Sequence, residues 1–162
     1  MGDACSIAGW GARFSEWKGD QTVSQALYQG GVNLLSKDYC KAHASNQINK
    51  DFSSTTTYKK MFEDLLQDDE LCGATPDLND NGLLDIGVDA CQGDSGGPLI
   101  CDVGGFAILQ GVISWGVGCN REGAAGVFAD VWHFRDWIDE QIKSDTDADI
   151  PDYDDLLPVL EE

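Results

Sequence analysis

Six cysteines, spread widely and without any Cys-x-x-Cys pair, constrain this 162-residue chain more than any other feature. An even number of cysteines in this arrangement predicts a disulfide framework rather than zinc ligation or redox catalysis. Counting alone leaves the pairing open. Because disulfides persist in oxidising compartments, we expect an extracellular or secreted protein. The cysteines are Cys5, Cys40, Cys72, Cys91, Cys101 and Cys119.

Short apolar runs bounded by glycines predict β-strands, and two stretches at helical spacing predict helices early in the chain. Ser36 and Thr57 are expected to cap these helices, over residues 36–41 and 57–67. Residues 132–142 carry apolar side chains on one helical face and predict an amphipathic terminal helix. Many short strands with one late helix indicate an all-β sandwich or barrel. The expected strands are residues 4–10, 23–35, 98–101, 107–115 and 126–131, with a polar loop at 73–88.

The net charge of −19 excludes partners that are themselves anionic, such as nucleic acid and acidic membranes. Residues 144–162 hold many of the acids, and we expect them to form a disordered tail, with residues 1–143 as the folded domain. The tail is expected to solubilise the protein; docking on a basic partner, with Tyr153 as a sulfation site, is the alternative. We find no signal peptide and no apolar run of about 20 residues. The chain is therefore expected to be a fragment without its export signal, or not exported.

The most informative segment is residues 89–98, Asp-Ala-Cys-Gln-Gly-Asp-Ser-Gly-Gly-Pro. Glycines on both sides of Ser95 allow a tight turn that brings backbone amides beside the hydroxyl. The amides of Gly93 and Ser95 are candidates to stabilise an oxyanion. Taken without its sequence context, this segment is equally consistent with a surface serine in a glycine-rich loop.

The surrounding motifs favour the catalytic interpretation. Residues 93–98 resemble the nucleophile motif of the chymotrypsin/trypsin family of serine proteases, peptidase S1. Residues 5–11, 114–116 with Cys119, 125–128 and 131–142 are similar, in the same order, to segments of that family's second β-barrel. The resemblance implies a trypsin-like antiparallel β-barrel, the second of the two-barrel fold, with a C-terminal α-helix.

One competing family uses some of the same letters. The pattern Gly93-x-Ser95-x-Gly97, followed by Asp130 and His133, also fits the nucleophile elbow of α/β-hydrolases. That elbow needs a helix directly after the serine, whereas an apolar run with strand character follows here.

The family resemblance implies a role for each matching residue. Ser95 becomes the acyl-transfer nucleophile, with the Gly93 and Ser95 amides as oxyanion hole. Asp94 matches the residue that ion-pairs with a newly freed N-terminus on activation. Asp89 matches the base of a pocket that selects Arg or Lys in a protein or peptide substrate. Other matching positions are the pocket walls Gly116 and Gly126, the substrate strand beginning at Ser114, and the disulfides Cys5–Cys101, Cys40–Cys72 and Cys91–Cys119.

The family's general-base histidine and its orienting aspartate belong to the first barrel, and neither is found in this sequence. His43 and His133 lack the family's catalytic context and are interpreted as ordinary packing or surface residues. We therefore expect the chain to be inactive alone and to need a missing N-terminal barrel as partner. The alternative is a non-catalytic, protease-like binding module or decoy.

Two insertions depart from the family pattern, between Cys40 and Cys72 and over residues 75–88. The first is expected to add a helix near the cleft. The second contains oxygen-bearing residues at EF-hand-like spacing, but position 12 is Val88 and flanking helices are absent. An Asx-rich turn is the favoured interpretation, with calcium as the alternative, and no organic cofactor is implied. The candidate calcium ligands are Asp77, Asn79, Asn81 and Asp85.

Overall fold

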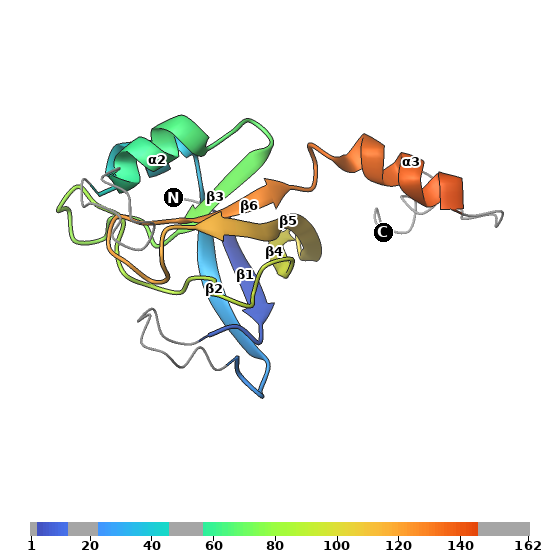
Figure 1. Ribbon diagram of the computed structural model, residues 1–162, viewed down its shortest axis with the longest axis horizontal. Helices are drawn as coiled ribbons and strands as arrows, with labels where there is room; N and C mark the ends of the chain where they lie inside the picture. The colour runs from blue at the N-terminus through green and yellow to red at the C-terminus, as the bar shows by residue number, and fades with distance from the viewer. Residues whose placement is uncertain (1–2, 13–22, 46–56, 146–162) are drawn as a thin grey trace. The chain divides into compact units, whose positions relative to one another are not determined.

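The computed structural model describes residues 3–12, 23–45 and 57–145, and the chain divides into two units, Met1–Trp132 and His133–Glu162. The first unit is a closed barrel of six antiparallel strands in the order β1-β2-β3-β6-β5-β4 (Figure 1). The second unit contains helix α3, Arg135–Asp145. An all-β barrel with a terminal helix is the fold that the resemblance implies. The strands are β1 Asp3–Gly9, β2 Tyr28–Leu35, β3 Glu70–Ala74, β4 Pro98–Val103, β5 Phe106–Gly116 and β6 Gly126–Asp130.

The pairing of β1 with β4 closes the barrel. Cys5 of β1 lies opposite Cys101 of β4 in this pairing, and a disulfide joins the two residues. The barrel interior is filled by residues from all the strands except β3, which contributes a partly buried leucine to the same cluster. Its buried members are Cys5, Ile7, Val32, Leu99, Cys101, Ile113 and Phe128.

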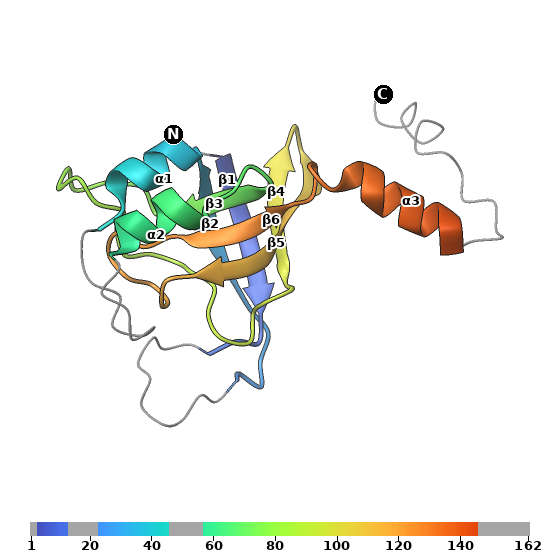
Figure 2. The same ribbon diagram turned by 45° about the horizontal axis from the view of Figure 1, so that its top comes forward.

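Helices α1 (Lys37–His43) and α2 (Tyr58–Leu65) lie together at one end of the barrel, and Figure 2 shows both beside β3. Each helix begins after the predicted cap: the Ser36 hydroxyl accepts from the Tyr39 amide, and the Thr57 hydroxyl from the Lys60 amide. A second core cluster joins these helices to the loop after β5. Its members include Cys40, Tyr58, Phe62, Leu84, Val117, Ala125 and Val127.

The β4–β5 hairpin illustrates how local sequence sets the turns. Gly104 and Gly105 both have positive φ, of 64° and 91°, which a two-residue turn of this hand requires. The Asp102 carboxylate accepts a hydrogen bond from the Gly105 amide at 2.9 Å and closes the turn.

The structure corrects several expected element boundaries. Strand β3 was not expected, because a five-residue run between acidic residues has no periodicity of its own; its pairing with β2 and β6 holds it. Residues 23–27 are not strand, and the terminal helix spans Arg135–Asp145 rather than 132–142. The expected acidic tail falls almost wholly outside the described residues. Within the described part of the chain, no helix is long and apolar enough to span a membrane.

Candidate active site

Ser95 lies exposed in a turn that hydrogen bonds hold against β5. The Gly97 amide donates to the Asp94 carbonyl at 2.9 Å, which closes a turn around Ser95. The Gly96 amide donates to the Ile113 carbonyl, and the Ile113 amide donates to the Gly97 carbonyl, both at 2.9 Å. Gly96 has a φ of 82°, a conformation that favours glycine. The serine is therefore presented outward from a rigid support.

The peptide bond between Gln92 and Gly93 is oriented by a residue that sequence reasoning missed. The Ala12 amide donates to the Gln92 carbonyl at 2.8 Å. Because a trans peptide places its C=O and N–H on opposite sides, the Gly93 N–H points away from Ala12. No described residue accepts a hydrogen bond from the Gly93 or Ser95 amide, so both remain available to a ligand.

Asp89 and Ser95 line the same pocket, which has a volume of about 120 Å³. Gly116 and Gly126 lie close together on the pocket wall, since a Cβ added at Gly116 would come within 3.8 Å of the Gly126 Cα. A Cβ added at Gly126 would approach the Asp89 carboxylate to 3.1 Å. The structure thus brings together Asp89, Ser95, Gly116 and Gly126, and Ser114 lines the same pocket.

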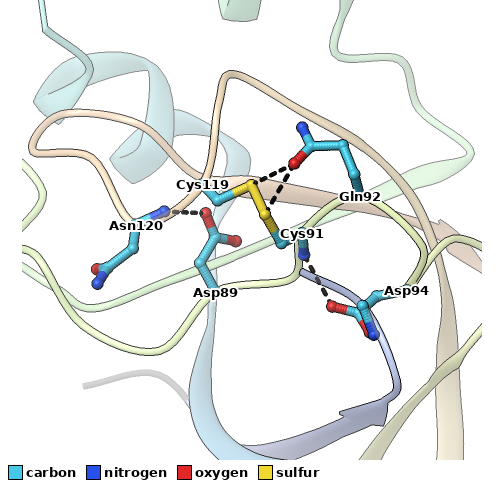
Figure 3. Close-up of a disulfide and its surroundings, with 7 residues drawn as sticks. Asp89, Cys91, Gln92, Asp94, Cys119 and Asn120 are labelled. Atoms are coloured by element: carbon cyan, nitrogen blue, oxygen red, sulfur yellow. Dashed lines mark hydrogen bonds between the residues drawn. A yellow bond between two sulfur atoms is a disulfide. The ribbon is translucent and has the colours of Figure 1, made fainter. Parts of the chain in front are cut away.

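The protein stabilises the charged form of the Asp89 carboxylate only weakly. Burial raises the pKa of Asp89 from 3.8 to about 6, although the backbone amides of Asn120 and Ala90 lower it by donating hydrogen bonds. The charge of Asp94 raises the pKa further. Figure 3 shows the carboxylate pointing toward the Asn120 amide, which donates to Oδ2 at 2.8 Å. A partly dehydrated carboxylate without a cationic partner among the described residues is a receptor for a cation.

The Cys91–Cys119 disulfide joins the two segments that carry the pocket (Figure 3). Cys91 leads into the Ser95 turn, and Cys119 lies in the loop after β5; both line the pocket. The Gln92 side-chain oxygen lies 2.9 Å from Cys91 Sγ and 3.3 Å from Cys119 Sγ. The disulfides in the structure are those that the resemblance implies.

Asp94 points into a different, larger pocket of about 390 Å³. Its carboxylate accepts hydrogen bonds from the Gly11 amide at 2.8 Å and from the Cys91 amide at 2.9 Å. The close approach depends on glycine, because a Cβ added at Gly9 would overlap the carboxylate. Asp89 lines this pocket as well, so two carboxylates border it.

Residues 114–116 form an open strand edge. Strand β4 pairs with β5 only as far as Val112, whereas β6 pairs along the other side as far as Gly116. The register of β5 shifts between Ile113 and Trp115, which leaves Ser114 without a partner on β6. Among the described strands, none pairs with residues 114–116 on the side opposite β6. An extended peptide fits such an edge.

Glu70 contacts Trp115, a residue that lines the pocket, and sequence reasoning did not find this contact. Its carboxylate accepts a hydrogen bond from the indole N–H of Trp115 at 2.7 Å. Phe62 of α2 stacks on the same indole, with ring centroids 5.9 Å apart. The predicted inserted helix therefore supports a residue of the pocket. No sequence signal could have linked these three residues, because their contact depends on how α2 packs.

The two histidines lie in other surroundings. The ring of His43 stacks on Tyr39 at 3.9 Å, and its Nδ1 lies 2.9 Å from the Tyr39 carbonyl. The His133 ring lies edge-on to Phe134 within the second unit. Among the described residues, no histidine lines either pocket.

The loop with the calcium-like spacing is closed by its own hydrogen bonds. The Asp77 carboxylate accepts from the amides of Asn81 at 3.1 Å and Gly82 at 2.8 Å, and the Asn79 amide group donates to Asp85. The Asp85 carboxylate also accepts from the Leu78 amide. The described residues include no group of three His, Cys, Asp or Glu side chains arranged to hold a metal. These contacts are those of an Asx-rich turn.

Comparison with known proteins gives consistent matches. A family model described as trypsin matches residues 66–138. Serine protease 56 from Mus musculus is 36% identical over 159 residues, or 96% of this chain and 22% of the relative. Coagulation factor XII from Rattus norvegicus is 35% identical over 139 residues, or 84% of this chain and 19% of the relative. Urokinase-type plasminogen activator from Gallus gallus is 34% identical over 140 residues, or 86% of this chain and 26% of the relative.

These relatives are much longer than this chain. The chain spans 22%, 19% and 26% of the three proteins named, so each contains extensive sequence with no counterpart here. The match to the family model includes the Ser95 turn, the Asp89 pocket and strands β4 to β6.

Proposed function

Because this chain belongs to the trypsin family of serine proteases, we propose that it carries the nucleophile half of an endopeptidase that cleaves after arginine or lysine. The observation that carries the proposal is that Ser95 and Asp89 line one small pocket. A substrate side chain reaching Asp89 would leave its carbonyl carbon beside the Ser95 hydroxyl.

The pocket supports selection of a cation. Asp89 is partly dehydrated, and its raised pKa of about 6 still leaves it ionised at neutral pH. An arginine or lysine side chain supplies the missing counter-charge, whereas a neutral side chain leaves the carboxylate unpaired. The glycines at 116 and 126 leave room for the long side chain, and the open edge at residues 114–116 pairs with the substrate backbone.

The chemistry proposed is acyl transfer. Ser95 Oγ attacks the scissile carbonyl carbon as a general base takes its proton, and the oxyanion accepts from the Gly93 and Ser95 amides. Collapse of this intermediate breaks the C–N bond and releases the amine with that proton. Water then releases the acid from Ser95. The Ala12 contact supports this role for Gly93, because it fixes the orientation of the Gln92–Gly93 peptide and turns the Gly93 N–H away from Ala12.

Asp94 is proposed as the partner of a new N-terminal ammonium group on activation. Its carboxylate borders the 390 Å³ pocket, which is large enough to take a chain terminus. Two backbone amides already donate to the Asp94 carboxylate, and an ammonium group there would donate a further, charge-assisted hydrogen bond to it.

The general base is proposed to come from a first barrel that packs on this one. Support comes from the β4–β5 hairpin, which exposes large apolar side chains in this structure. The isolated chain is then inactive, since its histidines line neither pocket. The three disulfides support an oxidising, extracellular location. The exposed side chains are Ile100, Val103, Phe106, Ile108 and Leu109.

A non-catalytic binding module is the second candidate, and the positions of the histidines favour it. Such a protein would bind arginine-containing peptides at Asp89 without cleaving them. Sequencing the transcript upstream of Met1 separates the two candidates, because an in-frame barrel with a catalytic histidine supports the protease.

The proposal is tested with the purified, oxidised chain and a fluorescent benzamidine, a planar cation of arginine shape. We expect saturable binding that the Asp89→Asn variant loses, and undiminished binding by Ser95→Ala. Equal binding by Asp89→Asn would refute the pocket assignment. We expect the chain alone to neither hydrolyse an arginine ester nor react with a serine-directed phosphonate. Turnover or stoichiometric labelling of Ser95 would contradict its dependence on another barrel.

A further inference from the structure

The loop after β5 is tied to the 75–88 insertion at successive residues. The Asn120 side-chain oxygen accepts from the Gly87 amide at 2.8 Å, and the Glu122 carboxylate accepts from the Asn81 side chain at 2.8 Å. The Gly123 amide donates to the Leu84 carbonyl at 2.7 Å. The insertion therefore holds this loop along its length.

Asn120 makes a reciprocal pair of hydrogen bonds with the segment that carries Asp89. Its side-chain oxygen accepts from Gly87, and its backbone amide donates to Asp89 Oδ2, both at 2.8 Å; Figure 3 shows the second of these bonds. The first bond fixes where the second donor lies. Asn120 also has a φ of 52°, a left-handed conformation that asparagine adopts more readily than most residues other than glycine.

We propose that Asn120 is the positioning residue of the cation pocket: through Gly87 it holds its own amide against the Asp89 carboxylate, and the 75–88 insertion supports it. The inference rests on the proposed function of Asp89 as the cation receptor. Asn120 acts through Asp89 and need not touch the substrate. The insertion thereby determines how strongly the pocket binds a cation, in addition to bordering the pocket.

The charged state of Asp89 reports on this contact. A donor fixed at 2.8 Å stabilises the carboxylate and opposes the effect of burial, while Asp94 is the charged side chain that opposes ionisation. If the donor loosens, the pKa of Asp89 rises, and below about pH 7 a smaller fraction of Asp89 is charged and able to bind a cation. A role limited to stability would leave this titration unchanged.

The test uses Asn120→Gly, which retains the positive φ and the backbone amide but loses the side-chain bond to Gly87. The matched control is Asp80→Gly, because exposed Asp80 is the other described non-glycine residue of positive φ, at 58°. Two quantities are measured in oxidised full-length chain with EDTA present: the Asp89 carboxyl titration by carbon NMR, and the affinity for the fluorescent benzamidine between pH 5 and 8.5.

We expect Asn120→Gly to raise the Asp89 titration midpoint by roughly half a pH unit, and to weaken benzamidine binding about threefold at pH 5 but hardly at pH 8, where Asp89 is ionised in both chains. Asp80→Gly should leave the Asp89 titration midpoint and the benzamidine affinity unchanged within experimental error. Glu122→Ala should give a smaller change of the same sign, and Glu122→Gln, which retains an acceptor for Asn81, should restore the original behaviour.

An unchanged Asp89 titration in Asn120→Gly would refute the positioning role, whatever the stability of the variant. Failure of the proposed function looks different: the benzamidine would then bind equally to the original chain and to Asp89→Asn, or to neither. The NMR titration does not require ligand binding, so it decides the role of Asn120 in either case.

Discussion

The charge on Asp89 should cost this protein stability at neutral pH. The carboxyl has a pKa of about 6 in the folded chain, against 3.8 for an unperturbed aspartate, chiefly because burial disfavours the charged form. A difference of this size corresponds to about 3 kcal/mol in the free energy of unfolding. We expect the Asp89→Asn variant, which is neutral at every pH, to be more stable than the original chain at pH 8 by up to that amount.

The pH dependence follows from the direction of the shift. Between about pH 6 and pH 4 the folded chain binds a proton at Asp89 that the unfolded chain does not bind. The stabilising contribution of protonation is therefore complete below about pH 4 and is lost as the pH rises through 6. The advantage of Asp89→Asn should shrink to nearly zero at pH 4.

Urea denaturation of the oxidised protein, followed by circular dichroism from pH 4 to 8, measures this difference. Subtracting the free energy of unfolding of one protein from that of the other removes the contribution of the groups that titrate in both. The control is Asp68→Asn, which removes the charge of an exposed aspartate that lines neither pocket. A difference for Asp89→Asn that is flat across this range, or a less stable variant at pH 8, would refute the reasoning.

Three further predictions concern the pocket and its supports. Gly126→Ala should weaken benzamidine binding at least tenfold, since the new Cβ would lie 3.1 Å from the Asp89 carboxylate; fluorescence titration measures this, and undiminished affinity would contradict the geometry. Phe62→Ala should lower the free energy of unfolding by about 3–5 kcal/mol in urea, because the side chain is fully buried in the helix-bearing core. Asp77→Ala should lower the free energy of unfolding by about 0.5–1.5 kcal/mol, since the exposed Asn81 and Gly82 amides lose an acceptor, and no measurable loss would show that other contacts hold the loop.

Elements with a strong local signal were predictable from the sequence. Ser36 and Thr57 cap helices where expected, because a side-chain oxygen bonding an amide three residues on is a local interaction. Strand β3 was missed because its stability comes from pairing with β2 and β6, which are distant in sequence. The boundary at residue 143 stays a prediction, and the tail beyond Asp145 lies outside the described residues.

The candidate site likewise contains residues that the sequence predicted and residues that it did not. The motif around Ser95 and the likeness of the flanking segments were sufficient to point to Asp89 and the pocket glycines. The contacts of Ala12, Glu70 and Asn120 carried no sequence signal, because each joins residues that only folding brings together.

The all-β class could be inferred from short apolar runs bounded by glycines, which are local patterns. The family, the cysteine pairing and the pocket residues were inferred from the likeness of short motifs to those of trypsin-like proteases. The folded structure was needed to establish that two insertions support the pocket walls and that Asn120 contacts Asp89. It also decided that burial shifts the Asp89 pKa to about 6. Desolvation and hydrogen-bond geometry depend on atoms far apart along the chain, so their balance exists only once the barrel has closed.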